Sequence, residues 1–187
     1  MTARLAAAAL TAVLFAACAA LPLAPRDPRP FDLLGRALVS YSGGAVTANL
    51  RWEHGPDRDE IWLMTPTGQT LAHIVDTAAG AVLTRADQQQ FRADNVESLT
   101  RQGLGWALPL GLLQYWVRGS AAPGYAPSEI ERDASGRMTA LTQNNWRVAL
   151  VYQSGDGEHA NRVRRVDLRD GPNEIRFVID TWRDLAQ

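Results

Sequence analysis

The side chains that most often carry out chemistry in proteins are few in this sequence and scattered along it. It has three histidines, His54, His73 and His159, and none has a second ligand at metal-site spacing. The motifs of serine hydrolases, phosphate loops and zinc hydrolases are absent. Acidic neighbours such as Asp59 and Glu60 are interpreted as solvated, although a carboxylate pair assembled by the fold stays open. The sequence therefore predicts no catalytic residue, no metal site and no cofactor.

The single cysteine indicates attachment to a membrane. Cys18 follows Arg4 and an apolar run over 5–15 that is too short to span a bilayer comfortably. Residues 14–18, Leu-Phe-Ala-Ala-Cys, resemble a bacterial lipoprotein signal, in which the cysteine is lipidated and becomes the mature N-terminus. Ala19, next in the chain, then implies sorting to the outer membrane. A plain secretory signal with an incidental cysteine is the alternative.

The chain divides into a signal, a tether and one domain. Residues 1–17 are expected to be the signal peptide. Residues 18–30 contain Pro22, Pro25, Pro28 and Pro30 and are expected to form a semi-extended tether behind the lipidated cysteine. The remaining residues, 31–187, suffice for a single globular domain with a hydrophobic core. The net charge of −1 gives no electrostatic reason to expect nucleic acid as a partner.

Alternating apolar and polar residues dominate the domain. Val46, Ala48, Leu50 and Trp52, for example, alternate with polar residues, which is typical of a half-buried strand. Turn residues separate one such segment from the next. The expected strands cover residues 35–41, 46–52, 60–65, 69–75, 81–84, 129–132, 138–142, 146–152, 163–168 and 174–182.

One helical pair interrupts the strands. Asp94 to Glu97 is typical of a capping box that opens a helix, which should end near Gly103. The very apolar stretch from Gly105 to Gly119 then predicts a second helix, with Pro109 in its first turn and Gly119 just past its end. A helix that is apolar on nearly all sides must be buried or must face an apolar ligand, and pattern alone favours an ordinary core helix.

The economical fold for this order is mainly β, with helices as a lid. A curved antiparallel sheet would present its concave face to the two helices. We expect an incomplete antiparallel β-barrel that encloses a hydrophobic space covered by α-helices.

Several short motifs, in this order, resemble the LolB family of outer-membrane lipoproteins. They are Gly35-Arg36, Leu50-Arg51-Trp52, Pro66 to Ala72 (PTGQTLA), Leu108-Pro109-Leu110, Tyr115 to Gly119 (YWVRG), Gln143 to Trp146 (QNNW) and Val178 to Trp182 (VIDTW). Each motif is weak by itself, but their order and spacing cover nearly the whole chain after the signal. The resemblance implies an incomplete barrel with a hydrophobic cavity and a helical lid.

The resemblance also implies a function without catalysis. Such a protein receives lipoproteins from the soluble periplasmic carrier LolA and inserts them into the outer membrane, where lipidated Cys18 would hold it on the periplasmic face. We expect a monomer that binds the acyl chains of lipoproteins. The cavity candidates are the large residues of the concave face and of the apolar helix: Leu50, Trp52, Ile61, Leu63, Leu71, Leu108, Leu112, Trp116, Trp146, Val148, Leu150, Phe177 and Ile179.

The turn Pro66-Thr67-Gly68 is expected to deliver the cargo to the membrane. Thr67 stands where the family carries an exposed leucine, which puts the membrane contact in doubt but not the cavity. Two other functions stay open: a structural or adaptor lipoprotein with a plain apolar core, and a lipid-modifying enzyme whose nucleophile the motifs do not reveal.

Overall fold

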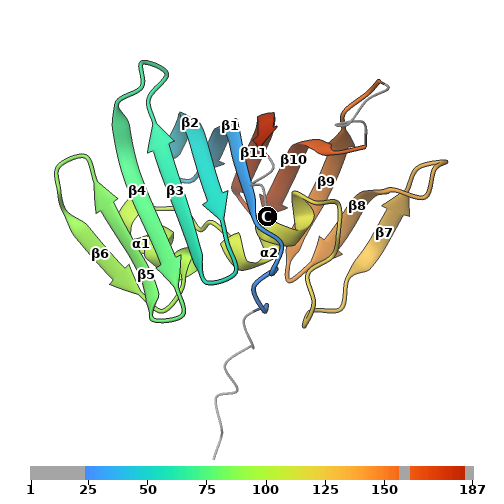
Figure 1. The fold of residues 1–187 in the computed structure, drawn as a ribbon, viewed down its shortest axis with the longest axis horizontal. Coiled ribbons are helices and arrows are strands. Elements are labelled where there is room, and N and C mark those ends of the chain that lie inside the picture. The colour runs from blue at the N-terminus through green and yellow to red at the C-terminus, as the bar shows by residue number, and fades with distance from the viewer. Residues whose placement is uncertain (1–23, 156–160, 184–187) are drawn as a thin grey trace, which may run out of the picture.

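Eleven strands form one antiparallel sheet that bends around two helices in the computed structural model, which describes residues 24–155 and 161–183 (Figure 1). The strands are β1 (Phe31–Tyr41), β2 (Gly44–His54), β3 (Arg58–Met64), β4 (Thr70–Thr77), β5 (Gly80–Arg85), β6 (Gln90–Ala93), β7 (Ser128–Arg132), β8 (Met138–Gln143), β9 (Trp146–Tyr152), β10 (Val163–Asp170) and β11 (Asn173–Arg183). The helices are α1 (Val96–Leu104) and α2 (Leu110–Trp116). Neither described helix is long and apolar enough to cross a membrane.

The sheet is open. Its strand order is β6-β5-β4-β3-β2-β1-β11-β10-β9-β8-β7, so the first and last strands of the chain pair in the middle, and β6 and β7 are the two edges. The helices lie across one face (Figure 1). This arrangement confirms the expected incomplete barrel with a helical lid.

Alternation along the strands builds the core. In β9, Trp146, Val148 and Leu150 are buried, whereas the residues between them are exposed. The same alternation holds in β3, in β2 from Ala48 onward and in β10 from Val166 to Leu168. The buried apolar residues of these strands join those of the helices in one hydrophobic cluster.

The helical segment is shorter than the sequence predicted. The side chain of Asn95 caps α1 by accepting a hydrogen bond from Ser98 N–H at 2.9 Å, and Gly105 ends that helix with φ +82°. Because Gly105 turns the chain there, residues 105–108 form a non-helical link and α2 begins only at Leu110. Gly119 has the expected left-handed conformation, with φ +73°, but it lies three residues past Trp116, because residues 117–119 form a turn after the helix.

Two further features were not predicted. Residues 90–93, for which no strand was expected, form the edge strand β6, because Phe91 and Ala93 pack against the core while Gln90 and Arg92 face solvent. Residues 24–30, assigned to the tether, pack against the domain, and the side chain of Asp27 is 1% exposed. The signal, Cys18 and the rest of the tether lie outside the described residues.

Candidate functional site

The cavity candidates from the sequence lie between the sheet and the helices. Leu71 is half-buried and the other twelve are buried, with 7% exposure or less. Their side chains belong to the same hydrophobic cluster, so most of the concave face is filled by α1, α2 and the link between them. Two pockets border these helices, one at each end of the strands.

An apolar pocket of about 240 Å³ opens at the end where β1 turns into β2 and β3 turns into β4. Strands β1 to β5 form one wall, and the end of α1 with the link forms the other. Of the thirteen candidates only Leu63 and Leu71 line it. The full set is Ala37, Val39, Val46, Ala48, Leu63, Leu71, Ala72, Arg85, Gly103, Leu104 and Trp106.

A β-bulge accounts for the place of Leu71 in this pocket. Strict alternation would put Leu71 and Ala72 on opposite faces of β4. The register between β3 and β4 passes from Leu63↔Ala72 to Met64↔Thr70, which leaves Leu71 unpaired. A bulge changes the direction in which the side chain of the unpaired residue points. Leu71 can therefore line the pocket together with its neighbour Ala72.

The loop expected to touch the membrane lies beside this pocket. Pro66, Thr67 and Gly68 are exposed and join β3 to β4 just beyond Leu63 and Leu71. Gly68 N–H donates to Thr65 O at 2.9 Å, which closes the tight turn that the sequence predicted. The hydroxyls of Thr65 and Thr67 are 2.8 Å apart and hydrogen-bond to each other.

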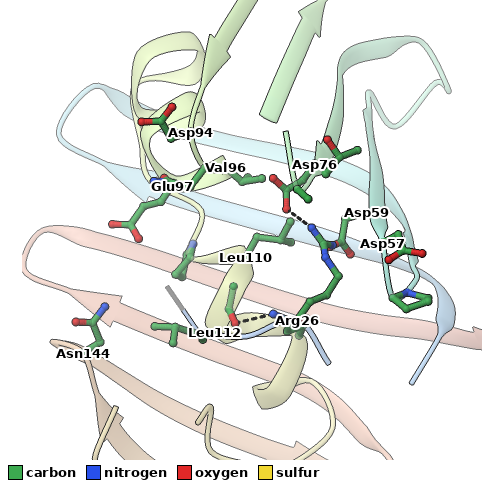
Figure 2. Close-up of a pocket in the computed structure, with 18 of the residues that line it drawn as sticks. Arg26, Asp57, Asp59, Asp76, Asp94, Val96, Glu97, Leu110, Leu112 and Asn144 are labelled. Atoms are coloured by element: carbon green, nitrogen blue, oxygen red, sulfur yellow. Dashed lines mark hydrogen bonds and ion pairs between the residues drawn. The ribbon is translucent and has the colours of Figure 1, made fainter. Parts of the chain in front are cut away.

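A second, larger pocket of about 410 Å³ lies at the opposite end of the strands. Figure 2 shows Arg26 reaching Asp76 and Asp59 on one side of it, with Asp94 and Glu97 on the other side. Leu110 and Leu112 of α2 contribute apolar surface. Among the described residues, no three His, Cys, Asp or Glu side chains come together as a metal site.

Residues 24–30, called the strap below, fasten α2 to the sheet. Asp27 N–H donates to Gln114 Oε1 at 2.8 Å, and the Tyr115 hydroxyl donates to Pro25 O at 2.8 Å. Arg118, just past α2, donates to Arg29 O at 2.6 Å. The polar face of the lid helix is therefore bound to a segment about 90 residues earlier in the chain.

The strap reaches the sheet through a buried polar cluster. Asp59 accepts from Trp52 Nε1 and contacts His54 Nδ1, both at 2.6 Å, and it also forms an ion pair with Arg26. His54 Nε2 lies 2.8 Å from Asp27 O. Both ring nitrogens of His54 thus have an oxygen neighbour, a carboxyl oxygen on one side and a backbone carbonyl on the other. The solvated role expected for Asp59 was wrong, because it is 3% exposed; His54 is buried with its polar atoms satisfied.

Two carboxylates near the strap have displaced pKa values. Burial acts to raise the pKa of Asp27, but hydrogen bonds from Arg29 and the charges of Arg29 and Arg118 outweigh it, so this pKa lies below its usual value. Burial raises the pKa of Asp76, and the charge and hydrogen bond of Arg26 offset only part of that rise. Ionised Asp27 thus favours the docked strap.

His73 lies apart from this cluster. His73 stacks on Trp62 at 5.0 Å between ring centroids, and its Nε2 is 3.1 Å from Glu60 Oε1. His159 lies outside the described residues. Neither the strap nor the bulge at Leu71 was predicted from the sequence.

The chain is similar to outer-membrane lipoproteins in sequence. Residues 29–182 match the model of the family described as outer membrane lipoprotein LolB. A LolB of Chromobacterium violaceum is 37% identical over 155 residues, covering 82% of this chain and 81% of the relative. A LolB of Nitrosomonas europaea is 38% identical over 156 residues, covering 82% and 73%.

Solved structures share the fold at low sequence identity. The crystal structure of a LolA superfamily protein from Nitrosomonas europaea superposes with a TM-score of 0.51 and 9% identity, covering 87% of this chain and 90% of that one. A putative outer membrane lipoprotein-sorting protein domain from Vibrio parahaemolyticus gives a TM-score of 0.50 and 8% identity, covering 84% and 86%. At this identity the likeness describes the fold alone.

Proposed function

The chain belongs to the LolB family of outer-membrane lipoproteins, and on that premise we propose that it accepts lipoproteins from the periplasmic carrier LolA and inserts them into the outer membrane. Cys18 anchors the protein to the periplasmic face of that membrane through its lipid. The protein works as a monomer, without a cofactor and without covalent chemistry on the cargo.

The observation that carries this proposal is the apolar pocket at the open end of the concave face. Apart from Arg85, its lining is apolar or glycine. It is continuous with a buried apolar face that runs under both helices. A volume of about 240 Å³ is below the roughly 300–1,000 Å³ of ordinary ligand pockets. Acyl chains therefore enter by widening this space at the expense of contacts between the helices and the sheet.

The energetics require direct handover. Removing an acyl chain from water gains roughly 0.8 kcal/mol per methylene, so about a dozen buried methylenes are worth about 10 kcal/mol. Release into water against that gain would be very slow. The cargo must pass from the carrier to this pocket and on to the bilayer without crossing water, and no nucleotide is needed if each site binds more tightly than the one before.

A binding experiment tests the pocket. Val46 lines it and is 37% exposed, so Val46→Trp should block the opening with little cost to the fold. Excluding two or three methylenes loses roughly 2 kcal/mol, or more than tenfold in affinity. Fluorescence titration of the Cys18→Ala protein with an uncharged apolar dye should show this loss. Val151→Trp is the matched control, because Val151 is 38% exposed and does not line this pocket.

The outcome separates this function from the adaptor alternative. An adaptor with a plain core would bind no dye, and Val46→Trp would then behave like Val151→Trp. Turnover of a phospholipid or an acyl ester would instead favour the lipid-modifying enzyme.

Delivery to the membrane is assigned to the Pro66-Thr67-Gly68 loop. A leucine at position 67 could bury in the bilayer interface with a gain of about 1.5–3 kcal/mol, which corresponds to roughly tenfold or more in occupancy of the membrane-touching state. Thr67→Leu should therefore speed release of a lipoprotein into outer-membrane vesicles, and Thr67→Glu should slow it. Uptake from the carrier should be unchanged in both variants.

A leucine in a turn at the other end of the sheet provides the control. Ala79 is exposed between β4 and β5, so Ala79→Leu adds the same side chain far from the pocket and should leave release unaltered. If both Thr67 variants released cargo at the rate of the unsubstituted protein, the loop would be a plain turn and another apolar element would have to carry delivery.

A further inference from the structure

Arg85 is the one charged side chain among the residues that line the apolar pocket. It is the last residue of β5 and pairs in register with Ala72, which is fully buried on the concave face. Ala81 and Leu83, at the preceding alternate positions, are 1% and 0% exposed. Arg85 therefore continues the inward-facing row of β5, at the place where that row reaches solvent.

The guanidinium group of Arg85 has few polar interactions in the described part of the chain. Its described hydrogen bond is a long one, 3.5 Å from Nη1 to Gln89 Oε1. Within residues 24–155 and 161–183 it forms no ion pair, whereas Arg26, Arg36 and Arg51 all pair with carboxylates. An arginine that is always charged carries several N–H donors in a planar fork, and its alkyl stem can lie along apolar surface while the head stays in water.

We propose that Arg85 binds the carbonyl head of the acyl chain that enters this pocket, and so fixes how deeply the chain is inserted. The proposal rests on the acyl-binding function proposed above. A chain linked through an ester or amide carries a carbonyl oxygen, a hydrogen-bond acceptor, at the end of an apolar tail. With the tail in the pocket, that oxygen comes to the opening, where Arg85 supplies the donor that solvent supplied before. A free fatty acid presents the same chemistry as a carboxylate, so the two sources must be told apart by experiment.

The test compares ligands with the same tail and different heads. An alkane, a fatty-acid methyl ester and the free fatty acid, all of equal chain length, displace an uncharged apolar dye from the Cys18→Ala protein. Arg85→Met keeps the stem of the side chain and removes the donors. A hydrogen bond to a charged donor supports roughly tenfold discrimination. Arg85→Met should thus weaken the ester about tenfold relative to the alkane, and Arg85→Lys should restore part of that preference.

Arg92→Met is the matched control. Arg92 is exposed on neighbouring β6, outside the pocket lining, and its described contact is a similarly long one, 3.4 Å to Gln90 Oε1. It should leave the binding of all three ligands unchanged.

Three results would overturn the proposal. An unchanged preference for ester over alkane in Arg85→Met would show that Arg85 does not contact the carbonyl. A loss confined to the free fatty acid would make Arg85 a simple anion site. An equal loss for ester and alkane would mean that Arg85 only shapes the wall. If none of the ligands displaced the dye from the unsubstituted protein, the acyl-binding function would fail together with the role of Arg85. In the first three results the unsubstituted protein still binds the ligands, so only the role of Arg85 fails.

Discussion

Gln143 is predicted to be the polar residue that contributes most to holding the lid. It is the last residue of β8 and is 1% exposed. Its oxygen accepts from Trp116 Nε1 at 2.9 Å and from Ala122 N–H at 3.0 Å, and its nitrogen donates to Ala122 O at 2.8 Å and to Tyr125 O at 2.7 Å. One buried amide thus joins the end of α2, the following loop and the sheet, with both its donors and both its acceptor positions used.

The size of the effect follows from these four bonds. Gln143→Met fills nearly the same space, so little of the change comes from a cavity, but it leaves two buried N–H groups and two carbonyls without this partner. Each orphaned buried donor costs about 1–3 kcal/mol, and a carbonyl costs less because of its second lone pair. The expected loss of unfolding free energy is on the order of 4 kcal/mol. Gln143→Glu should lose at least as much, since it gives up both donors and buries a carboxyl group.

Urea unfolding followed by far-UV circular dichroism measures this loss without relying on Trp116 as the probe. Gln153→Met makes the same substitution at an exposed position just after β9 and should change the unfolding free energy by less than about 0.5 kcal/mol. A loss below about 1 kcal/mol for Gln143→Met would refute the reasoning, because it would mean that the four bonds contribute little net free energy or that water replaces the amide at no cost.

Three further substitutions test other parts of the fold by the same unfolding assay. Because the pKa of Asp27 is lowered in the fold, the contribution of ionised Asp27 to the unfolding free energy is fully present above the ordinary carboxyl pKa of about 4 and is lost as the pH falls through the folded value. Asp27→Asn should therefore lower the unfolding free energy at pH 7. A difference in unfolding free energy from the unsubstituted protein that stayed constant down to pH 2 would contradict this. Gly35→Ala should destabilise by at least 1–3 kcal/mol, since its Cβ would lie 2.3 Å from Val178 O, and a neutral result would show that the strands separate easily there. Gly111→Ala, on the exposed side of α2 with no atom near the new methyl group, should stabilise by roughly 0.5–1 kcal/mol, and a loss would indicate that α2 is strained.

Most of the fold could be predicted because the strands are half-buried and their alternation is visible in the sequence. The residue range of β9, Trp146–Tyr152, was predicted without error. β6 was missed because four residues with polar neighbours carry too little alternation to reveal a strand. α2 was predicted too long because the apolar pattern continues through Trp106 and Leu108, which are buried in the link rather than in the helix.

The candidate site was less accessible to sequence analysis. The sequence identified the concave face but not which part of it stays unfilled, because that depends on where the helices end. Leu63 and Leu71 were predicted as cavity residues, whereas Arg85 was not, since a charged residue at the end of a strand is usually interpreted as solvated. The strap was missed for a different reason: it has no periodicity, and its partners, such as Gln114, are 87 residues away from Asp27. Gln143 falls between the expected strands 138–142 and 146–152 and was therefore assigned to a turn, because nothing local shows that its amide is buried.

The distribution of polar contacts decides which part of the lid can yield to an acyl chain. Gln114 and Tyr115 bind the strap, and Trp116 binds Gln143, so α2 is fastened on two sides. In the described part of the chain, residues 101–109 make no hydrogen bond to a strand, and Leu108 N–H bonds only within the helical layer, to Thr100 Oγ1 at 2.9 Å. Apolar contacts alone hold that stretch against the sheet, and it supplies the helical wall of the apolar pocket. Apolar contacts can be exchanged for contacts with an acyl chain at little net cost in free energy, whereas moving α2 would leave buried hydrogen-bond donors without partners. If acyl chains enter as proposed, we therefore expect the pocket to widen by displacement of the end of α1 and the link, with the left-handed Gly105 between them, while α2 stays in place.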